Sequence, residues 1–157
     1  MTNKLCLGTA KIGMPDYGYS DGNALKDPTN FILRSLDLGI RSIDTSPRYG
    51  NSEELIGKAL KLCSKKPLIN TKIDNLTPNL SKTPELMLNS INDSIHKLGA
   101  SIDICYLHQN EIDIISDKYV HEGIELLKNS NLIKEVGTSV YSKEELMYTL
   151  DCGIFDW

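Results

Sequence analysis

The segment Gly8–Gly13, which reads GTAKIG, decides between two folds that the rest of the chain allows. It lies at the end of the apolar run Leu5–Thr9, where a first strand would pass into a first helix. In an open, doubly wound sheet, the phosphate-binding turn at this place reads GxGxxG and opens a helix. Here the glycines have another spacing, and the chain continues into a polar loop through Tyr17 and Gly22. We therefore expect a closed barrel.

Outward from this segment, short apolar runs alternate with stretches of helical periodicity, which is typical of repeated βα units around a parallel sheet. Capping signals predict where helices begin: Asp27 precedes Pro28, and Ser142 is followed three residues later by Glu145. Further helices are expected after Asn51 or Ser52, after Thr83, over Asp117–Asn129, and from Ser142 to Gly153. The expected strands are Leu5–Thr9, Ile40–Asp44, Leu68–Lys72, Ile102–Leu107, Ile133–Thr138 and Ile154–Trp157.

The expected fold class is therefore α/β, a (β/α)8 TIM-barrel type in an incomplete form, with about five βα units and the start of strand six. Residues 1–157 would form one partial barrel domain. A complete barrel takes about 250 residues, and this chain has 157. Because open sheet edges and an open apolar interior favour pairing with another chain, we expect a fragment, a truncated gene product or a self-associating chain.

Composition limits the classes of partner. The net charge is -4, and basic residues are interspersed with acidic ones, so nucleic acid is not an expected partner. No apolar run approaches the roughly 20 residues of a membrane span, and no signal peptide is recognisable, which predicts a cytoplasmic protein without a membrane partner. The four cysteines form no CxxC pair, so they are expected to be buried thiols, and no metal site is expected.

Four polar residues lie at or after predicted strand ends, where barrel enzymes place their active sites. Asp44 ends the second strand and Tyr49 follows it, while Lys72 ends the third strand and His108 follows the fourth. A tyrosine is a useful proton donor at neutral pH only if a nearby cation lowers its pKa, and a lysine paired with an aspartate supplies that cation. A histidine can orient a carbonyl oxygen, so together these groups suit protonation of an alkoxide as it forms.

Each of these residues also has an ordinary structural explanation. Asp44 could cap a turn, Tyr49 could be a loop aromatic, Lys72 could be a solvated surface lysine, and His108 could be structural. A different barrel enzyme, a lyase or isomerase that uses Lys72 as a Schiff-base amine, is a further alternative. The four residue types together, at successive strand ends, favour proton transfer.

Several segments of the chain resemble the aldo-keto reductase family. Ile43–Glu53, which reads IDTSPRYGNSE, with Gly57–Lys58 after it, is similar to the family's signature segment. Thr71–Lys72 looks like its lysine strand, Tyr106–His108 like its histidine strand, and Gly137–Ser139 like the strand whose serine meets the nicotinamide carboxamide. The resemblance covers the whole chain in the right order.

The resemblance implies an NADPH-dependent oxidoreductase that reduces the aldehyde or ketone group of a small-molecule carbonyl substrate. Tyr49 would be the proton donor, Lys72 and Asp44 would tune it, and His108 would orient the substrate. Hydride would come from NADPH.

The nicotinamide end of the cofactor would be contacted by Thr9, Asp44 and Ser139. Family members commonly have Asn directly after that serine, whereas this chain has Val140. The segment Lys11–Gly22 looks like a bacterial branch of the family whose members often accompany surface-polysaccharide genes, which suggests a sugar-related carbonyl substrate. The alternative is a catalytically inactive, truncated barrel fragment that associates with itself through its open edges.

Overall fold

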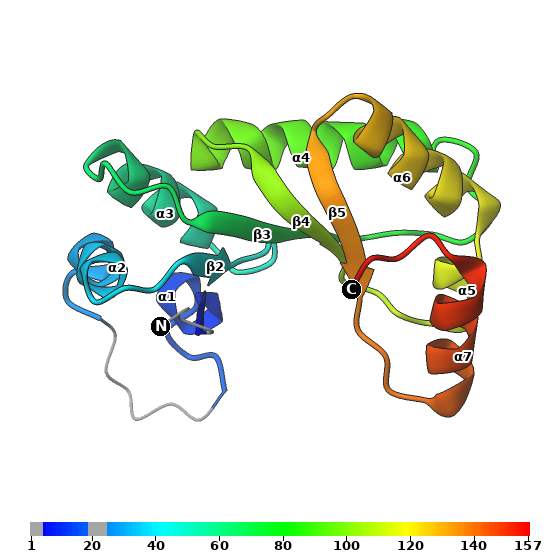
Figure 1. Ribbon diagram of the computed structural model, residues 1–157, viewed down its shortest axis with the longest axis horizontal. Coiled ribbons are helices and arrows are strands. Elements are labelled where there is room, and N and C mark those ends of the chain that lie inside the picture. The colour runs from blue at the N-terminus through cyan, green and yellow to red at the C-terminus, as the bar shows by residue number, and fades with distance from the viewer. Residues whose placement is uncertain (1–4, 19–24) are drawn as a thin grey trace. The chain divides into compact units, whose positions relative to one another are not determined.

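The computed structural model describes residues 5–18 and 25–157, and its strands form a five-stranded sheet (Figure 1). The strands lie in the sheet in the order in which they occur in the chain. The pairs β1–β2, β2–β3 and β4–β5 are parallel. The strands are β1 (Cys6–Gly8), β2 (Ser42–Asp44), β3 (Leu68–Ile73), β4 (Ile102–Leu107) and β5 (Ile133–Thr138).

Helices separate the strands along the chain, as the alternation in the sequence predicts. The helices are α1 (Ala10–Gly13), α2 (Pro28–Asp37), α3 (Ser52–Lys61), α4 (Thr83–Leu98), α5 (Ile112–Ile115), α6 (Lys118–Asn129) and α7 (Lys143–Cys152).

The predicted strands agree with the observed ones most closely in the second half of the chain. The bounds of β4 and β5 are confirmed, whereas β1 and β2 are shorter than predicted and β3 extends to Ile73. The predicted sixth strand, Ile154–Trp157, is not a regular strand. Its backbone nevertheless pairs with β5, because the Asp156 N–H donates to the Val136 carbonyl at 2.8 Å and the Thr138 N–H donates to the Trp157 carbonyl at 3.2 Å.

Two short helices were not predicted. The segment after β1 was expected to be a polar loop, but Ala10–Gly13 forms the helix α1, and Ile112–Ile115 forms α5. Helices of four residues are too short to show a hydrophobic period, which explains why the sequence pattern did not indicate them. The part of the expected loop at residues 19–22 lies outside the described residues.

Predicted capping residues are confirmed where the signal is local. The Asp27 side chain accepts the Asn30 N–H at 3.0 Å, and the Ser142 and Glu145 side chains form a reciprocal capping box. Gly153 ends α7 with φ of 68°, a left-handed conformation that glycine adopts without steric cost. Helix α3 starts where it was predicted, with Asn51 as the N-cap residue, but the Asn51 side chain makes no capping bond.

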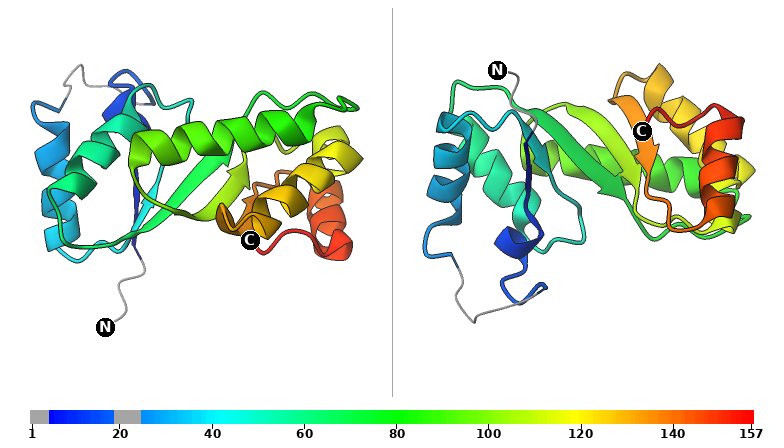
Figure 2. Two further views of the ribbon diagram at one scale, coloured as in Figure 1. Left: turned by 90° about the horizontal axis from the view of Figure 1, so that it is seen from above. Right: turned by 60° about the horizontal axis from the view of Figure 1, so that its bottom comes forward.

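The chain divides into two compact units. The first comprises the residues through Thr71 together with Ser94–Ser101. In it α2 and α1 pack against α3, as the views in Figure 2 also show for α2 and α3. A Cβ atom on Gly57 would lie 2.2 Å from the Lys97 carbonyl oxygen, so only glycine permits this close approach to α3. The fully buried apolar side chains of the unit include Ile32, Leu36, Ile43, Ile56 and Ile69.

The second unit comprises Lys72–Asp93 together with Ile102–Trp157. In it β4 pairs with β5, α6 packs on β5, and α5 contacts both α6 and α7, as the views in Figure 2 show for α5 and α7. Helix α7 differs from the other long helices, because it buries none of its residues. The buried apolar side chains of the unit include Met87, Ile91, Ile115, Ile124, Leu127 and Val136.

Two expectations from composition can be compared with the structure. Over the described residues, no helix is both long enough and apolar enough to cross a membrane. The expectation of four buried thiols is wrong: Cys105 is buried, but Cys6 is exposed, and Cys63 and Cys152 are partly exposed. Cys6 is exposed because β1 is a short strand at the edge of the sheet.

Candidate active site

The first unit carries Asp44 and Tyr49, two of the four predicted catalytic residues. Asp44 is the last residue of β2, where it is half-buried, and its carbonyl oxygen accepts the Thr9 N–H at 3.0 Å. Tyr49 is also half-buried and lies in the loop that connects β2 to α3. Its N–H donates to the Ser46 carbonyl at 3.0 Å, and its ring centroid lies 6.3 Å from that of Tyr17. The two candidate residues are therefore at opposite ends of one short, hydrogen-bonded connection.

Close backbone packing fixes the loop that carries Tyr49. A Cβ atom on Gly13 would lie 1.7 Å from the Tyr49 carbonyl oxygen and 2.8 Å from the Ser52 nitrogen, so the end of α1 lies directly against this loop. On the other side of the contact, Gly50 has φ of 55°, which side chains other than glycine rarely adopt. Two glycines that are 37 positions apart thus allow the loop to pack backbone to backbone.

A chain of hydroxyl groups lies beneath the same loop. The Thr45 hydroxyl donates to the Ser52 hydroxyl oxygen at 3.0 Å, and the Ser52 hydroxyl donates to that of Thr9 at 2.6 Å. Thr9 in turn donates to the Asp44 carbonyl oxygen at 2.8 Å. Thr9, Thr45 and Ser52 are fully buried; the sequence indicated no role for Thr45 and only a possible helix cap for Ser52. Because Thr9 lies 43 positions from Ser52, no local pattern indicates the contact.

Glu53 forms a separate buried contact in the first unit. Its Oε1 accepts the Thr71 hydroxyl at 2.8 Å, and its Oε2 lies 4.0 Å from the Lys97 ammonium nitrogen. Glu53 is only 2% exposed, and Thr71 is fully buried. Burial of a carboxylate is unfavourable unless hydrogen bonds and an opposite charge compensate for lost solvation. Here Thr71 satisfies Oε1, whereas Oε2 is near the Lys97 charge and has no hydrogen-bond partner among the described residues.

The second unit carries Lys72 and His108. Both are half-buried, Lys72 near the end of β3 and His108 directly after β4. The His108 N–H donates to the carbonyl oxygen of Ile73, the residue after Lys72, at 2.8 Å. The ends of the two strands that carry these candidates are therefore side by side.

Cys105, three residues before His108, is not suited to nucleophilic chemistry. Burial raises the pKa of its thiol to about 12, although the positive charge of Lys72 and a hydrogen bond with the Ile73 backbone oppose the shift. The thiolate is the reactive form of cysteine, so this side chain is unreactive at neutral pH.

The loop between β3 and α4 is held at two points by residues that follow β4. The Gln109 amide exchanges two hydrogen bonds with the backbone of Leu76, accepting at 2.6 Å and donating at 3.0 Å. The Asp117 carboxylate accepts the Asn79 N–H at 2.6 Å and also caps α6 by accepting the N–H groups of Tyr119 and Val120. The sequence indicated Asp117 only as the start of a helix and did not indicate Gln109, because both contacts with this loop are long-range.

Asp117 is stabilised in its charged form. Burial alone would raise its pKa, but hydrogen bonds from the N–H groups of Asn79, Val120 and Tyr119, together with the nearby His121, lower the pKa below its ordinary value of 3.8. The carboxylate thus remains ionised at all but strongly acidic pH.

The predicted cofactor residue Ser139 follows the last residue of β5 and is exposed. Its carbonyl oxygen accepts the Thr138 hydroxyl at 3.3 Å. Val140, which stands where family members commonly have Asn, is also exposed. The hydroxyl of Ser139 lies at a strand end, as predicted.

The structure thus groups the predicted site residues in two pairs, Asp44 with Tyr49 in the first unit and Lys72 with His108 in the second. Within the first unit, Asn70 of β3 is the register partner of Asp44, and Lys72 follows Asn70 by two residues along the chain.

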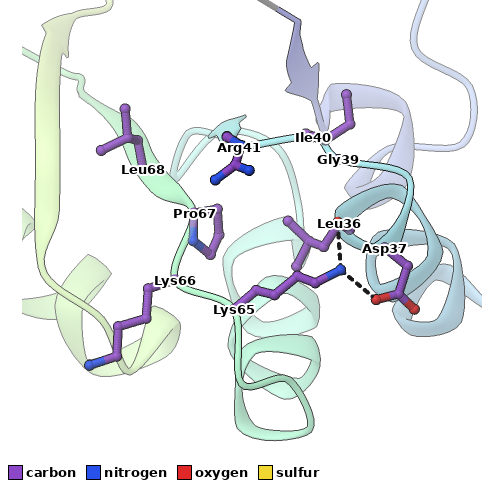
Figure 3. Close-up of a pocket in the computed structure, with 9 residues that line it drawn as sticks. All are labelled: Leu36, Asp37, Gly39, Ile40, Arg41, Lys65, Lys66, Pro67 and Leu68. Atoms are coloured by element: carbon purple, nitrogen blue, oxygen red, sulfur yellow. Dashed lines mark hydrogen bonds and ion pairs between the residues drawn. The ribbon is translucent and has the colours of Figure 1, made fainter. Parts of the chain in front are cut away.

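A cavity of about 550 Å³ in the first unit lies away from these strand ends (Figure 3). It is lined by residues that precede β2 and β3, including Arg41, Lys65 and Lys66. The Lys65 ammonium group donates to the Leu36 carbonyl at 3.0 Å and to the Asp37 carboxylate at 2.7 Å. Active sites of barrel enzymes lie at the carboxyl ends of the strands, so this cavity is not the candidate site.

Comparison with known proteins identifies the family to which the chain belongs. The model of the aldo/keto reductase family matches residues 4–154, and the chain belongs to this family. The aldo-keto reductase YhdN of Bacillus subtilis is 26% identical over 155 residues, and the match covers 92% of this chain and 45% of that protein. Methylglyoxal reductase DkgA of Escherichia coli is 34% identical over 125 residues, covering 76% of this chain and 42% of that protein.

Solved structures give the same result for the fold. The glycerol dehydrogenase of Gluconobacter oxydans superimposes with a TM-score of 0.72 at 26% identity, covering 96% of this chain and 48% of that one. The predicted (β/α)8 class is confirmed, and the five parallel strands correspond to part of the barrel. The chain spans less than half the length of the curated relatives that it matches.

Proposed function

We propose that this chain carries the proton-transfer residues of a nicotinamide-dependent carbonyl reductase. The observation that supports the proposal is the placement of Asp44, Lys72 and His108 at the carboxyl ends of three strands that are consecutive in the sheet, with Tyr49 in the loop after the first of them. Active-site residues of barrel enzymes come from these positions.

In the proposed reaction the carbonyl group of the substrate becomes an alcohol. When bound, NADPH supplies hydride to the carbonyl carbon. The Tyr49 hydroxyl donates a proton to the carbonyl oxygen as negative charge develops there. The Lys72 ammonium group, with Asp44 as its counter-charge, stabilises the tyrosinate that remains, and His108 donates a hydrogen bond that orients the oxygen.

The three predicted cofactor residues differ in how well they could contact the nicotinamide. Ser139 is exposed, and Asp44 is half-buried at a strand end, so neither residue is closed off from solvent. Thr9 is fully buried, and its hydroxyl is already donated to the Asp44 carbonyl. We propose that Asp44 and Ser139 hold the carboxamide, and that Thr9 contributes indirectly through Asp44.

For the substrate we propose a small aldehyde or ketone that carries further oxygen atoms. Methylglyoxal, for which one relative is named, is a compound of this kind, and glycerol, for which a solved neighbour is named, is the alcohol form of one. A sugar-related carbonyl, as suggested by Lys11–Gly22, belongs to the same class. NADPH is the proposed donor rather than NADH.

The proposal is tested by adding NADPH or NADH to the purified chain with methylglyoxal, glyceraldehyde or acetone, and following the absorbance of the reduced cofactor with product analysis. We expect oxidation of NADPH, with one alcohol formed for each NADPH consumed, faster for the oxygenated substrates than for acetone. Cofactor oxidation that gives no alcohol, or no oxidation with any substrate, would contradict the proposal for this chain.

The alternative, a non-catalytic chain that associates with itself, is favoured by one observation. Helix α7 buries none of its residues and exposes Leu146, Met147 and Leu150, which share one face at helical spacing. Exposed apolar patches mark interaction surfaces. Sedimentation of the wild-type chain and of Leu150→Glu tests this alternative: concentration-dependent association that the substitution abolishes would support it, and a monomer at all concentrations would exclude it.

A further inference from the structure

We propose that Ser52 is a positioning residue, which holds Asp44 and Tyr49 in place through its buried hydroxyl and its main-chain N–H. The inference rests on the proposed function, because it concerns the two candidate residues of the first unit. All the contacts that support it lie within that unit.

The hydroxyl of Ser52 closes a ring of hydrogen bonds around the end of β2. The ring begins at the Thr45 hydroxyl, passes through Ser52 and Thr9, and ends at the carbonyl oxygen of Asp44, the residue before Thr45. Each hydroxyl donates once, in one direction, so every bond polarises the next. Ser52 therefore ties the carbonyl of Asp44 and the side chain of Thr45 to one buried point.

The main chain of Ser52 fixes the other candidate residue. Its N–H donates to the Tyr49 carbonyl oxygen at 3.0 Å. The same two atoms lie against Gly13, where a Cβ atom would overlap both. Since Asp44 and Tyr49 are joined by only four residues, one residue that binds both ends sets the shape of the whole connection.

Helix capping does not account for this use of the Ser52 hydroxyl. A serine at a helix start ordinarily accepts a backbone N–H two or three residues later. Here Asn51 is the N-cap residue, and Ser52 is the first residue inside α3. Its hydroxyl bonds instead to Thr9 and Thr45, and Ser52 is 0% exposed, so these bonds replace all contact with water.

Thr71 provides a matched control for loss of a buried hydroxyl. Thr9 and Thr45 directly follow β1 and β2, and Thr71 lies in β3; each follows a residue of the register row Gly8, Asp44 and Asn70. All three threonines are fully buried. The Thr71 hydroxyl, however, donates to Glu53 and not to the ring. Its removal therefore shows the effect of losing a buried hydroxyl that does not belong to the ring.

The experiment compares Ser52→Ala, Thr9→Val and Thr71→Val in the full chain labelled with ¹³C-tyrosine, with the Tyr49 ring signals assigned from their loss in Tyr49→Phe. We expect Ser52→Ala and Thr9→Val to shift the Tyr49 ring signals in the absence of cofactor, and Thr71→Val to leave them in place. With NADPH and substrate, Ser52→Ala should lower kcat roughly 10- to 100-fold with little change in KM, as expected for misplaced reacting groups.

Unshifted Tyr49 signals in both Ser52→Ala and Thr9→Val would overturn the proposal, and so would an equal shift in Thr71→Val. Thr9→Val keeps the side-chain volume, so it serves if Ser52→Ala does not fold. The spectra do not depend on turnover. A wild-type chain without reductase activity would therefore contradict the proposed function while the signals still decide the role of Ser52.

Discussion

The connection between β2 and α3 in the first unit and the loop between β3 and α4 in the second are held by different chemistry. Neutral hydroxyl groups and backbone packing hold the first, through Ser52 and Gly13. A carboxylate and an amide hold the second, through Asp117 and Gln109. Each segment follows a strand that carries a candidate catalytic residue. A loop can therefore be held in place without charge, and only the second arrangement depends on an ionised group.

The largest expected effect concerns the close packing in the first unit. Gly13→Ala would place a Cβ atom 1.7 Å from the Tyr49 carbonyl oxygen, so the backbone of α1 or of the loop must move. We expect a loss of about 3 kcal/mol in the free energy of unfolding, at the upper end for overpacking. Urea denaturation measures it. Gly8→Ala, whose Cβ would meet nothing within 4 Å, is the control, and equal losses would show that the contact is not tight.

In the second unit, Asp117→Ala is expected to have the next largest effect. The substitution removes the acceptor for three backbone N–H groups, those of Asn79, Tyr119 and Val120. Loss of a helix cap and of a charged acceptor costs about 2 kcal/mol. Asp113→Ala, an exposed acidic residue in the first turn of α5, is the control for charge in thermal unfolding. If both variants unfold together with the wild type, the loop does not depend on Asp117.

Acid should weaken the loop held by Asp117 and not the loop held by neutral hydroxyl groups. The folded-state pKa of Asp117 is lowered below 3.8. Its contribution to stability is therefore present above the ordinary pKa and is lost as the pH falls through the lowered value. We expect Asp117→Asn to be less stable than the wild type at neutral pH and the difference to shrink below about pH 4. Unfolding measured from pH 7 to pH 2 tests this, and a difference that stays constant would exclude a role for the charge.

A smaller effect is expected at Gln109. Gln109→Ala removes two hydrogen bonds to Leu76 in a half-buried position, where water can replace part of the interaction. The expected loss is about 1 kcal/mol, with faster amide exchange at Leu76. Gln109→Glu keeps the acceptor and loses the donor, so its stability should lie between that of the wild type and that of Gln109→Ala. A Leu76 amide that exchanges at the wild-type rate in Gln109→Ala would show that the loop is held elsewhere.

Local signals in the sequence predicted much of the fold. Asp27 and Ser142 cap helices as expected, because each cap depends on residues within three positions. The strand ends that carry Asp44 and Lys72 followed from short apolar runs. The four-residue helices α1 and α5 were missed because they are shorter than the period that reveals a helix.

The sequence indicated the residue types of the candidate site, but it did not indicate the residues that hold the neighbouring loops in place. Tyr49 and His108 stood out because chemistry-bearing residues follow strands in a barrel pattern. Ser52 gave only a capping signal, and its partner Thr9 is 43 positions away. Gln109 is likewise 33 positions from Leu76. Contacts of this kind depend on how strands are placed side by side, which one-dimensional periodicity does not specify.

The role of Tyr49 as proton donor of a carbonyl reductase is tested by the rate of NADPH oxidation with methylglyoxal in the wild-type chain, Tyr49→Phe and Tyr141→Phe. Tyr141 is 84% exposed and serves as the control. Loss of a general acid lowers rates by about 10²–10⁴-fold. If Tyr49 is the proton donor, we expect such a loss of rate for Tyr49→Phe, with unchanged NADPH affinity, and wild-type rates for Tyr141→Phe. A Tyr49→Phe chain that reduces methylglyoxal as fast as Tyr141→Phe would contradict it.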